Sequence, residues 1–208
     1  MACIYIIAGP PGIGKSTSGH EFIPENIDIW DADMIAQRYR HMGYTDYKDI
    51  GNMRFQQSVQ RSLISGEDFA IELNLGFQSH YDYLRKVKSF NADNSIHIVL
   101  FYTEQIALCL ERARRRHTAG LHLVQPETIH EMYAATFTLL RAHLKLVDRL
   151  TLVDVMTTGT PYICGGWSWP STSLQLKEDA PRWASQLNED LKAVSKQQIK
   201  RKPRGPRL

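Results

Sequence analysis

Short apolar runs alternate with longer amphipathic segments along most of the chain. Residues 3–8 (CIYIIA) and 95–102 (SIHIVLFY) are continuous apolar runs, the pattern of strands that are buried on both faces of a parallel sheet. Shorter runs of the same kind recur between polar segments. The strands expected from these runs are residues 3–8, 27–30, 69–75, 95–102 and 149–155, with residues 160–166 as a further closing strand.

The segments between the runs have the apolar periodicity of helices. In residues 52–65 apolar side chains stand at Met53, Val59 and Leu63, and Gly66 follows as a stop signal. Pro126 occupies the first turn of another helical pattern, where its missing N–H is harmless. The expected helices are residues 34–42, 52–65, 81–90, 104–117, 126–147 and 182–194, with a helix start in residues 16–23.

Strands that alternate with helices of this length predict right-handed βαβ units. We therefore expect an α/β fold of three layers, in which helices cover both faces of a mainly parallel five-stranded sheet. The expected organisation is a domain in residues 1–166, a connector and packed helix in 167–195, and a basic, disordered tail in 196–208.

Composition and charge narrow the class of protein. The chain has 208 residues, which suits one domain, and 43% of them are hydrophobic, enough for an ordinary core. The net charge of +3 belongs to the tail, because residues 196–208 hold six Lys/Arg and no acid, so residues 1–195 carry −3. Nucleic acid is thus expected as a partner only through the tail.

The sequence also gives an expectation for the compartment. No apolar run approaches the ~20 residues that cross a bilayer, and the first strand leaves no room for a signal peptide. The three cysteines, Cys3, Cys109 and Cys164, stand far apart in apolar stretches and fit neither a disulfide framework nor a zinc site. We expect a cytoplasmic protein with no membrane partner and with reduced cysteines.

The loop after the first strand has the most specific chemistry in the chain. Residues 9–16 (GPPGIGKS) fit the P-loop pattern G-x-x-x-x-G-K-[ST], and the loop stands between a strand and a helix start, as that pattern requires. Its glycines allow backbone N–H groups to surround a phosphate, its lysine adds a charge, and its serine hydroxyl suits Mg²⁺. The predicted nucleotide-binding residues are Gly9, Pro10, Pro11, Gly12, Ile13, Gly14, Lys15, Ser16 and Thr17.

Three carboxylates stand where parallel strands are expected to end. Asp31 and Asp33 follow the second strand, and Glu72 interrupts the apolar third one. Such a pair of aspartates can divide the work, one taking a proton from the attacking hydroxyl and the other holding Mg²⁺ through water. The alternatives are that an aspartate only caps the next helix and that Glu72 only faces solvent at an edge.

The helix expected at residues 104–117 ends in an arginine cluster, which consists of Arg112, Arg114, Arg115 and Arg116. Arg112 shares a helix face with Arg115 and Arg116, so one of these guanidinium groups can reach a nucleotide and stabilise the transition state. The alternative is a solvated cluster that favours the negative end of the helix.

Taken together, these stretches resemble the zeta-toxin-like family of small P-loop kinases. The resemblance runs from about Ile4 to Ile163. It consists of GPPGIGKST, WDADMIAQRY, FAIELNL, ERARRRHTAGLHLVQPETIHEMY and DRLTLVD. The chain departs from the family pattern at Leu73 and Asn74, and again at residues 130–132 before Tyr133.

The resemblance implies a P-loop NTPase/kinase fold and transfer of phosphate from ATP or GTP to a small molecule, in several members a UDP-activated amino sugar. It also implies Mg²⁺ and, in toxin members, an antitoxin partner. The roles that it implies are phosphate and Mg²⁺ binding for Lys15 and Ser16, catalysis by Asp33 or Asp31, phosphate contacts for Arg112 and Arg116, and a substrate contact for Glu72. From the residues themselves we also expect Asp31 to hold Mg²⁺ through water and Asn74, close to Glu72, to contact the substrate.

Three functions follow as hypotheses. The first is a small-molecule kinase, which the P-loop, the carboxylates and the arginines favour together. The second is a kinase of nucleosides or of nucleic-acid 5′ ends, with the basic tail holding the polymer. The third is a nucleotide-binding module without turnover. A GTPase is disfavoured because the chain contains no N-K-x-D motif for reading guanine.

Overall fold

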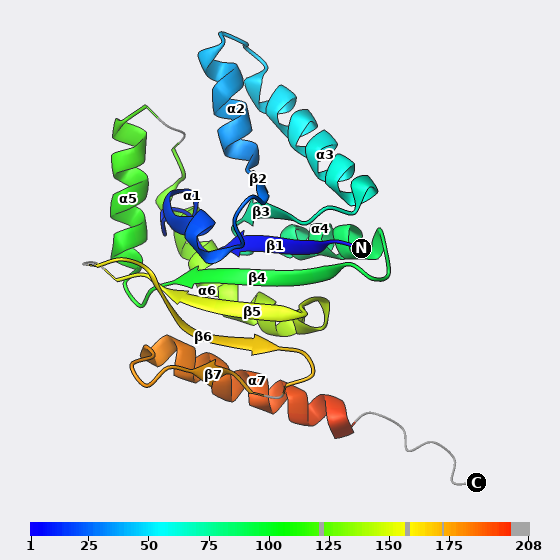
Figure 1. Ribbon diagram of the computed structural model, residues 1–208. Helices are drawn as coiled ribbons and strands as arrows, with labels where there is room; N and C mark the ends of the chain where they lie inside the picture. Colours follow the sequence, from blue (N-terminus) through cyan, green and yellow to red (C-terminus); the bar gives the residue numbers. More distant parts are fainter. Residues whose placement is uncertain (121–122, 157–158, 172, 201–208) are drawn as a thin grey trace.

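A computed structural model describes residues 1–120, 123–156, 159–171 and 173–200. Its described strands form one sheet in the order β2-β3-β1-β4-β5-β6-β7 (Figure 1). The strands are β1 (Cys3–Ala8), β2 (Asp28–Trp30), β3 (Phe69–Leu73), β4 (Ser95–Tyr102), β5 (Arg149–Asp154), β6 (Tyr162–Ser168) and β7 (Gln175–Leu176). The first five pair in parallel, whereas β6 and β7 are antiparallel to their neighbours.

The α/β prediction is confirmed, but the prediction of a mainly parallel five-stranded sheet is wrong, because the sheet is mixed and has seven strands in the described residues. The connection from β5 to β6 spans only residues 155–161. A connection between parallel strands needs about a dozen residues or more. Because this connection is shorter, β6 runs antiparallel to β5. The two-residue strand β7 lies within the predicted connector and gives too short a pattern to recognise.

The helices follow the predicted order with shifted ends. They are α1 (Lys15–Ser18), α2 (Ala32–His41), α3 (Tyr47–Ser65), α4 (Gln78–Ser89), α5 (Ile106–Thr118), α6 (Pro126–Ala142) and α7 (Arg182–Lys200), with 3-10 turns η1 (Gly19–Phe22) and η2 (Leu144–Leu146). Helix α3 begins five residues before its predicted start. Helix α7 reaches Lys200, so part of the predicted tail is helical, and residues 201–208 lie outside the described residues.

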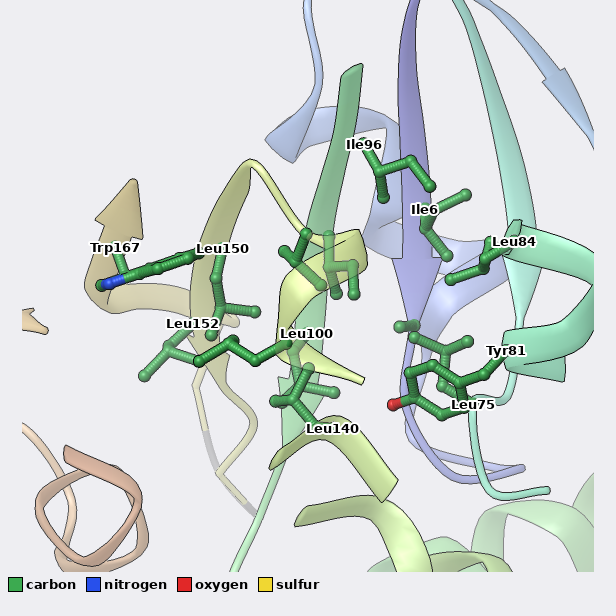
Figure 2. Packing of buried hydrophobic residues seen from close by; sticks show 14 of the residues in the cluster. Ile6, Leu75, Tyr81, Leu84, Ile96, Leu100, Leu140, Leu150, Leu152 and Trp167 are labelled. Atoms are coloured by element: carbon green, nitrogen blue, oxygen red, sulfur yellow. The ribbon is translucent and has the colours of Figure 1, made fainter. Parts of the chain in front are cut away.

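Apolar clusters on both faces of the sheet form the core. One face packs against α4, α6 and α7 and includes Ile6, Leu84, Leu100 and Leu140 (Figure 2). The opposite face is smaller and joins the P-loop to α5 through Ile13, Phe101 and Cys109. The P-loop is therefore fixed on a rigid support. No helix in the described part of the chain combines the length and hydropathy needed to span a bilayer.

Helices α2 and α3 form an antiparallel pair, the α2–α3 arm (residues 32–65), which projects beyond the edge of the sheet (Figure 1). The arm is held closely together, because a Cβ added to Gly51 would lie 2.7 Å from Cα of Ala36. At the base of the arm, Asp31 caps α2 by accepting hydrogen bonds from the backbone N–H groups of Asp33 and Met34. The cap sets the direction in which the arm leaves the sheet.

Candidate active site

The P-loop joins β1 to α1 and is largely buried from Gly9 to Ile13, whereas Ser16 and Thr17 are exposed. Gly9 has φ of 138°, and an added Cβ would lie 2.3 Å from the carbonyl oxygen of Phe101. Only glycine fits this backbone and this approach. The loop therefore holds one preset conformation, as a phosphate site requires.

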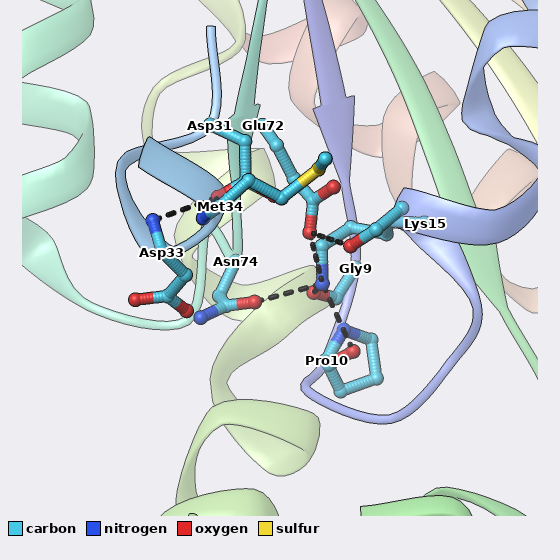
Figure 3. Close-up of polar contacts among 9 residues, drawn as sticks. Gly9, Pro10, Lys15, Asp31, Asp33, Met34, Glu72 and Asn74 are labelled. Atoms are coloured by element: carbon cyan, nitrogen blue, oxygen red, sulfur yellow. Dashed lines mark hydrogen bonds and ion pairs between the residues drawn. The ribbon is translucent and has the colours of Figure 1, made fainter. Parts of the chain in front are cut away.

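Lys15 lies almost completely buried within the loop (Figure 3). Its Nζ donates hydrogen bonds to the carbonyl oxygens of Gly9 (2.9 Å) and Pro10 (3.2 Å) and to Oδ1 of Asn74 (2.8 Å). Burial lowers the pKa of Lys15, while the nearby charges of Glu72 and Asp31 oppose that change. The ammonium group is thus held by three oxygen acceptors in the position where a phosphate oxygen would meet it.

Glu72, at the carboxyl end of β3, faces the loop from the neighbouring strand. Its Oε1 accepts a hydrogen bond from Oγ of Ser16 at 3.1 Å and lies 3.9 Å from Nζ of Lys15. Burial raises the pKa of Glu72, and the positive charge of Lys15 only partly offsets this. A carboxylate of this kind binds cations and hydrogen-bond donors strongly, because few water molecules compete for it.

Asp31 and Asp33 differ in burial and in hydrogen bonding. Asp31 is buried and capped onto α2, and burial raises its pKa despite the two backbone hydrogen bonds. The Asp33 side chain is exposed and points away from Glu72 (Figure 3), and its carboxylate has no hydrogen-bond partner among the described residues. The capping alternative therefore applies to Asp31, while Asp33 remains available to a ligand.

The arginines of α5 also differ in their contacts. Nη1 of Arg112 donates a hydrogen bond to the carbonyl oxygen of Ile13 at 2.9 Å and lies beside Gly14, so this guanidinium touches the P-loop. Arg116 is exposed, and its charge acts on Lys15 and Glu72. Arg115 pairs instead with Glu111 on the same helix. The structure thus brings Arg112 to the loop, and the phosphate contact predicted for Arg116 stays a prediction.

A cavity of about 170 Å³ opens beside Asp33 in the α2–α3 arm. Its lining consists of Ala32, Asp33, Ala36 and Gln37 from α2 and Tyr47, Lys48 and Asn52 from α3. Asp33 thus belongs both to the first turn of α2, two residues after the capping Asp31, and to the lining of this cavity.

The oxygen donors near the loop fit Mg²⁺. In phosphoryl-transfer sites Mg²⁺ is held by one or two side-chain oxygens together with substrate phosphates and water. The Ser16 hydroxyl, already 3.1 Å from Glu72, and the Asp31 carboxylate supply such oxygens. The described residues contain no cluster of three or more His, Cys, Asp or Glu that could hold a metal without a nucleotide.

Sequence reasoning missed three features of this site. The amide oxygen of Asn74 accepts a hydrogen bond from Lys15, which the sequence did not indicate, while its predicted contact with a substrate stays a prediction. The α3 residues of the cavity went unnoticed because the helix was expected to begin only at residue 52. Arg40, which donates to the carbonyl oxygen of Gly120 at 3.1 Å, has no signal in the sequence, because the two residues are 80 positions apart.

Comparison with known proteins places the fold. No protein-family model and no curated protein matches the chain. Among solved structures, it is similar to a structure of the AvrRxo1-ORF1:ORF2 complex with ATP, with a TM-score of 0.62 and 11% identity, covering 93% of this chain and 64% of that one. It is also similar to a structure of the PezAT chromosomal toxin–antitoxin system of Streptococcus pneumoniae, with a TM-score of 0.56 and 16% identity, covering 96% and 86%.

These likenesses confirm the resemblance to zeta-toxin-like P-loop kinases at the level of the fold. This chain spans less than two thirds of the AvrRxo1 chain that it matches.

Proposed function

We propose that the protein is a phosphotransferase that moves the γ-phosphoryl group of ATP or GTP to a hydroxyl group of a small molecule. The observation that carries this proposal is the P-loop with its buried Lys15, which has the carboxylates of Glu72 and Asp31 as charged neighbours, together with Asp33, which follows Asp31 by two residues and lines a cavity in the arm. The similar AvrRxo1 structure contains ATP, which supports a nucleotide as the phosphoryl donor.

Each site residue has a role in the proposed reaction. Backbone N–H groups of the non-proline residues of the P-loop surround the phosphates, and Lys15 exchanges its present acceptors for phosphate oxygens. Arg112 and Arg116 neutralise the charge that spreads over the transferred group. Asp33 accepts the proton of the attacking hydroxyl.

Mg²⁺ belongs to the same proposal. Ser16 would hold it directly and Asp31 through water, with Glu72 beside the Ser16 hydroxyl. The ion supplies charge neutralisation on the nucleotide phosphates. Glu72, at the carboxyl end of β3, would also contact the substrate.

A protein partner is a further part of the proposal. One of the similar structures is that of the PezAT toxin–antitoxin system, and the other is that of the AvrRxo1-ORF1:ORF2 complex. An antitoxin that binds this chain and blocks its activity is the corresponding partner.

The test is incubation of the purified protein with γ-labelled ATP or GTP, Mg²⁺ and a deproteinised metabolite extract, followed by identification of the labelled product. We expect label on a small acceptor, and a fall in kcat of about 10²-fold or more in Asp33→Asn, because general-base catalysis contributes factors of that size. Asp49→Asn, an exposed change on α3, is the matched control. Thermal unfolding checks that both variants fold.

Three results would replace the proposal. Transfer that persists in Asp33→Asn removes that residue as the base. Label on nucleic-acid 5′ ends, lost when residues 196–208 are deleted, favours a polynucleotide kinase. Tight nucleotide binding without transfer to any acceptor indicates a non-catalytic module.

A further inference from the structure

We propose that the cavity in the α2–α3 arm is the acceptor site and that its acceptor is a small hydroxy compound with an anionic group, of the hydroxy-acid class. This inference rests on the proposed function and specifies the substrate for it. The cavity places a carboxylate, Asp33, and an ammonium group, Lys48, on one small polar surface. A hydroxyl group suits the first and an anion suits the second.

The lining of the cavity is polar enough to bind a small, strongly hydrated molecule. Besides the two charged groups, it offers the amides of Gln37 and Asn52 and the ring of Tyr47. Amide groups both donate and accept hydrogen bonds, so they match neighbouring hydroxyl groups. Ala32 and Ala36 add only small apolar side chains, and the Tyr47 ring, over which the Arg40 guanidinium lies, is the one aromatic surface in the lining.

The size of the cavity points the same way. Its volume of about 170 Å³ falls below the ~300–1,000 Å³ of pockets that enclose drug-sized ligands. A UDP-activated amino sugar is larger than such ligands and would have to lie mostly outside. The cavity therefore favours an acceptor much smaller than a nucleotide sugar.

The register of the arm separates its two charged groups. Ala36 lies against Gly51, and the Arg40 guanidinium lies over the Tyr47 ring, so the two helices run antiparallel with Lys48 opposite the second half of α2. Asp33 and Lys48 are then about six residues apart along the arm, or ~9 Å at 1.5 Å per residue. An acceptor of a few carbon atoms reaches from one to the other.

Net charge supports an anionic acceptor. The arm, residues 32–65, has five Lys/Arg and three Asp/Glu, a net charge of +2. The rest of residues 1–195 has 14 Lys/Arg and 19 Asp/Glu, a net charge of −5. The arm is thus a positive part of a negative domain, and a field of this sign attracts anions.

The transfer step balances with these residues. The acceptor oxygen forms a bond to the γ-phosphorus while the bond from that phosphorus to the β–γ bridging oxygen breaks. The nucleoside diphosphate leaves with the electron pair of the broken bond, and the hydroxyl proton passes to Asp33. The anionic group of the acceptor stays at Lys48 throughout and takes no part in the chemistry.

The test separates acceptors by charge before the reaction. A deproteinised metabolite extract is divided by anion exchange into an anionic and a non-anionic fraction, and each is incubated with the full chain, γ-labelled ATP and Mg²⁺. Glycerate and glycerol serve as a defined pair of probes, with UDP-N-acetylglucosamine as the nucleotide sugar. Kinetics are then compared for the wild type, Lys48→Met and Lys48→Arg, with Lys86→Met on the exposed side of α4 as control.

We expect label only from the anionic fraction, on products smaller than a nucleotide. Lys48→Met should raise KM for the labelled acceptor at least tenfold with little change in kcat, and Lys48→Arg should restore most of the loss. Label from the non-anionic fraction, preference for glycerol over glycerate, preference for the nucleotide sugar, or an unchanged KM in Lys48→Met overturns the inference while leaving the kinase intact. Absence of label from every fraction instead contradicts the proposed function itself.

Discussion

At the scale of single residues, Glu72 carries a conflict between burial and charge. The carboxylate is mostly enclosed, and burial raises its pKa even though Lys15 and Ser16 both favour the ionised form. The folded protein therefore holds this proton up to a higher pH than the unfolded chain does. Stability from this group is complete below the unfolded pKa and is lost as pH rises through the folded pKa.

We predict that Glu72→Gln stabilises the protein at about pH 8 and that this gain disappears at about pH 3, where Glu72 is protonated in both states. The amide keeps the size of the side chain but cannot ionise. Thermal unfolding across this pH range checks the prediction, with the exposed Glu178→Gln as control. A loss of stability in Glu72→Gln at the higher pH would show that the contacts with Lys15 and Ser16 outweigh burial.

Residues also show where prediction from the sequence stops. The P-loop was predictable because its spacing is local, and Asp31 and Glu72 because the ends of parallel strands meet at one edge. The partner of Asn74 was not predictable, since it depends on a rotamer that meets Lys15 from another strand. The division of roles between Asp31 and Asp33 likewise depends on which carboxylate caps α2.

At the scale of elements, the α2–α3 arm explains the error at the start of α3. Glycine is less favourable than alanine in a helix interior by about 1 kcal/mol, so Gly51 is a local signal for a helix boundary. The glycine is instead the point at which α3 approaches α2, and no side chain would fit there. A local signal for a helix boundary was in fact a packing requirement between two helices.

We predict that Gly51→Ala lowers the free energy of unfolding by about 1–2 kcal/mol, although alanine in a helix interior is normally better than glycine by about 1 kcal/mol. The added methyl group would lie 2.7 Å from Cα and Cβ of Ala36 and would push the helices apart. Chemical denaturation measures the change, and Gln56→Ala on the exposed side of α3 is the control. A more stable Gly51→Ala would mean that the arm separates at little cost.

The sheet prediction missed the antiparallel direction of β6 and the presence of β7, and chain connectivity explains the first of these errors. Apolar runs reveal that a strand exists but not its direction, which the length of the connection decides. The helices on both faces and the order of elements could be predicted because they follow from alternation alone.

At the scale of the whole molecule, the proposed donor site and the proposed acceptor site belong to different elements of the structure. The P-loop is anchored to α5 through Arg112, whereas Asp33 and the cavity belong to the arm. Arg40 connects the two, because it lies over the Tyr47 ring and donates to the carbonyl oxygen of Gly120 just after α5. The proposed reaction would need the arm and α5 at a fixed separation, and this contact links the two.

We therefore predict that Arg40→Met leaves nucleotide affinity unchanged and lowers kcat about fivefold, the effect of losing ~1 kcal/mol from a partly solvated hydrogen bond. Methionine keeps an unbranched side chain but removes the guanidinium that donates to Gly120. Steady-state kinetics together with nucleotide titration measure the two quantities. Arg38→Met is the matched control, since the Arg38 guanidinium has no hydrogen-bond or ion-pair partner among the described residues. If both variants lose the same activity, the charge of α2 matters and the bridge to Gly120 does not.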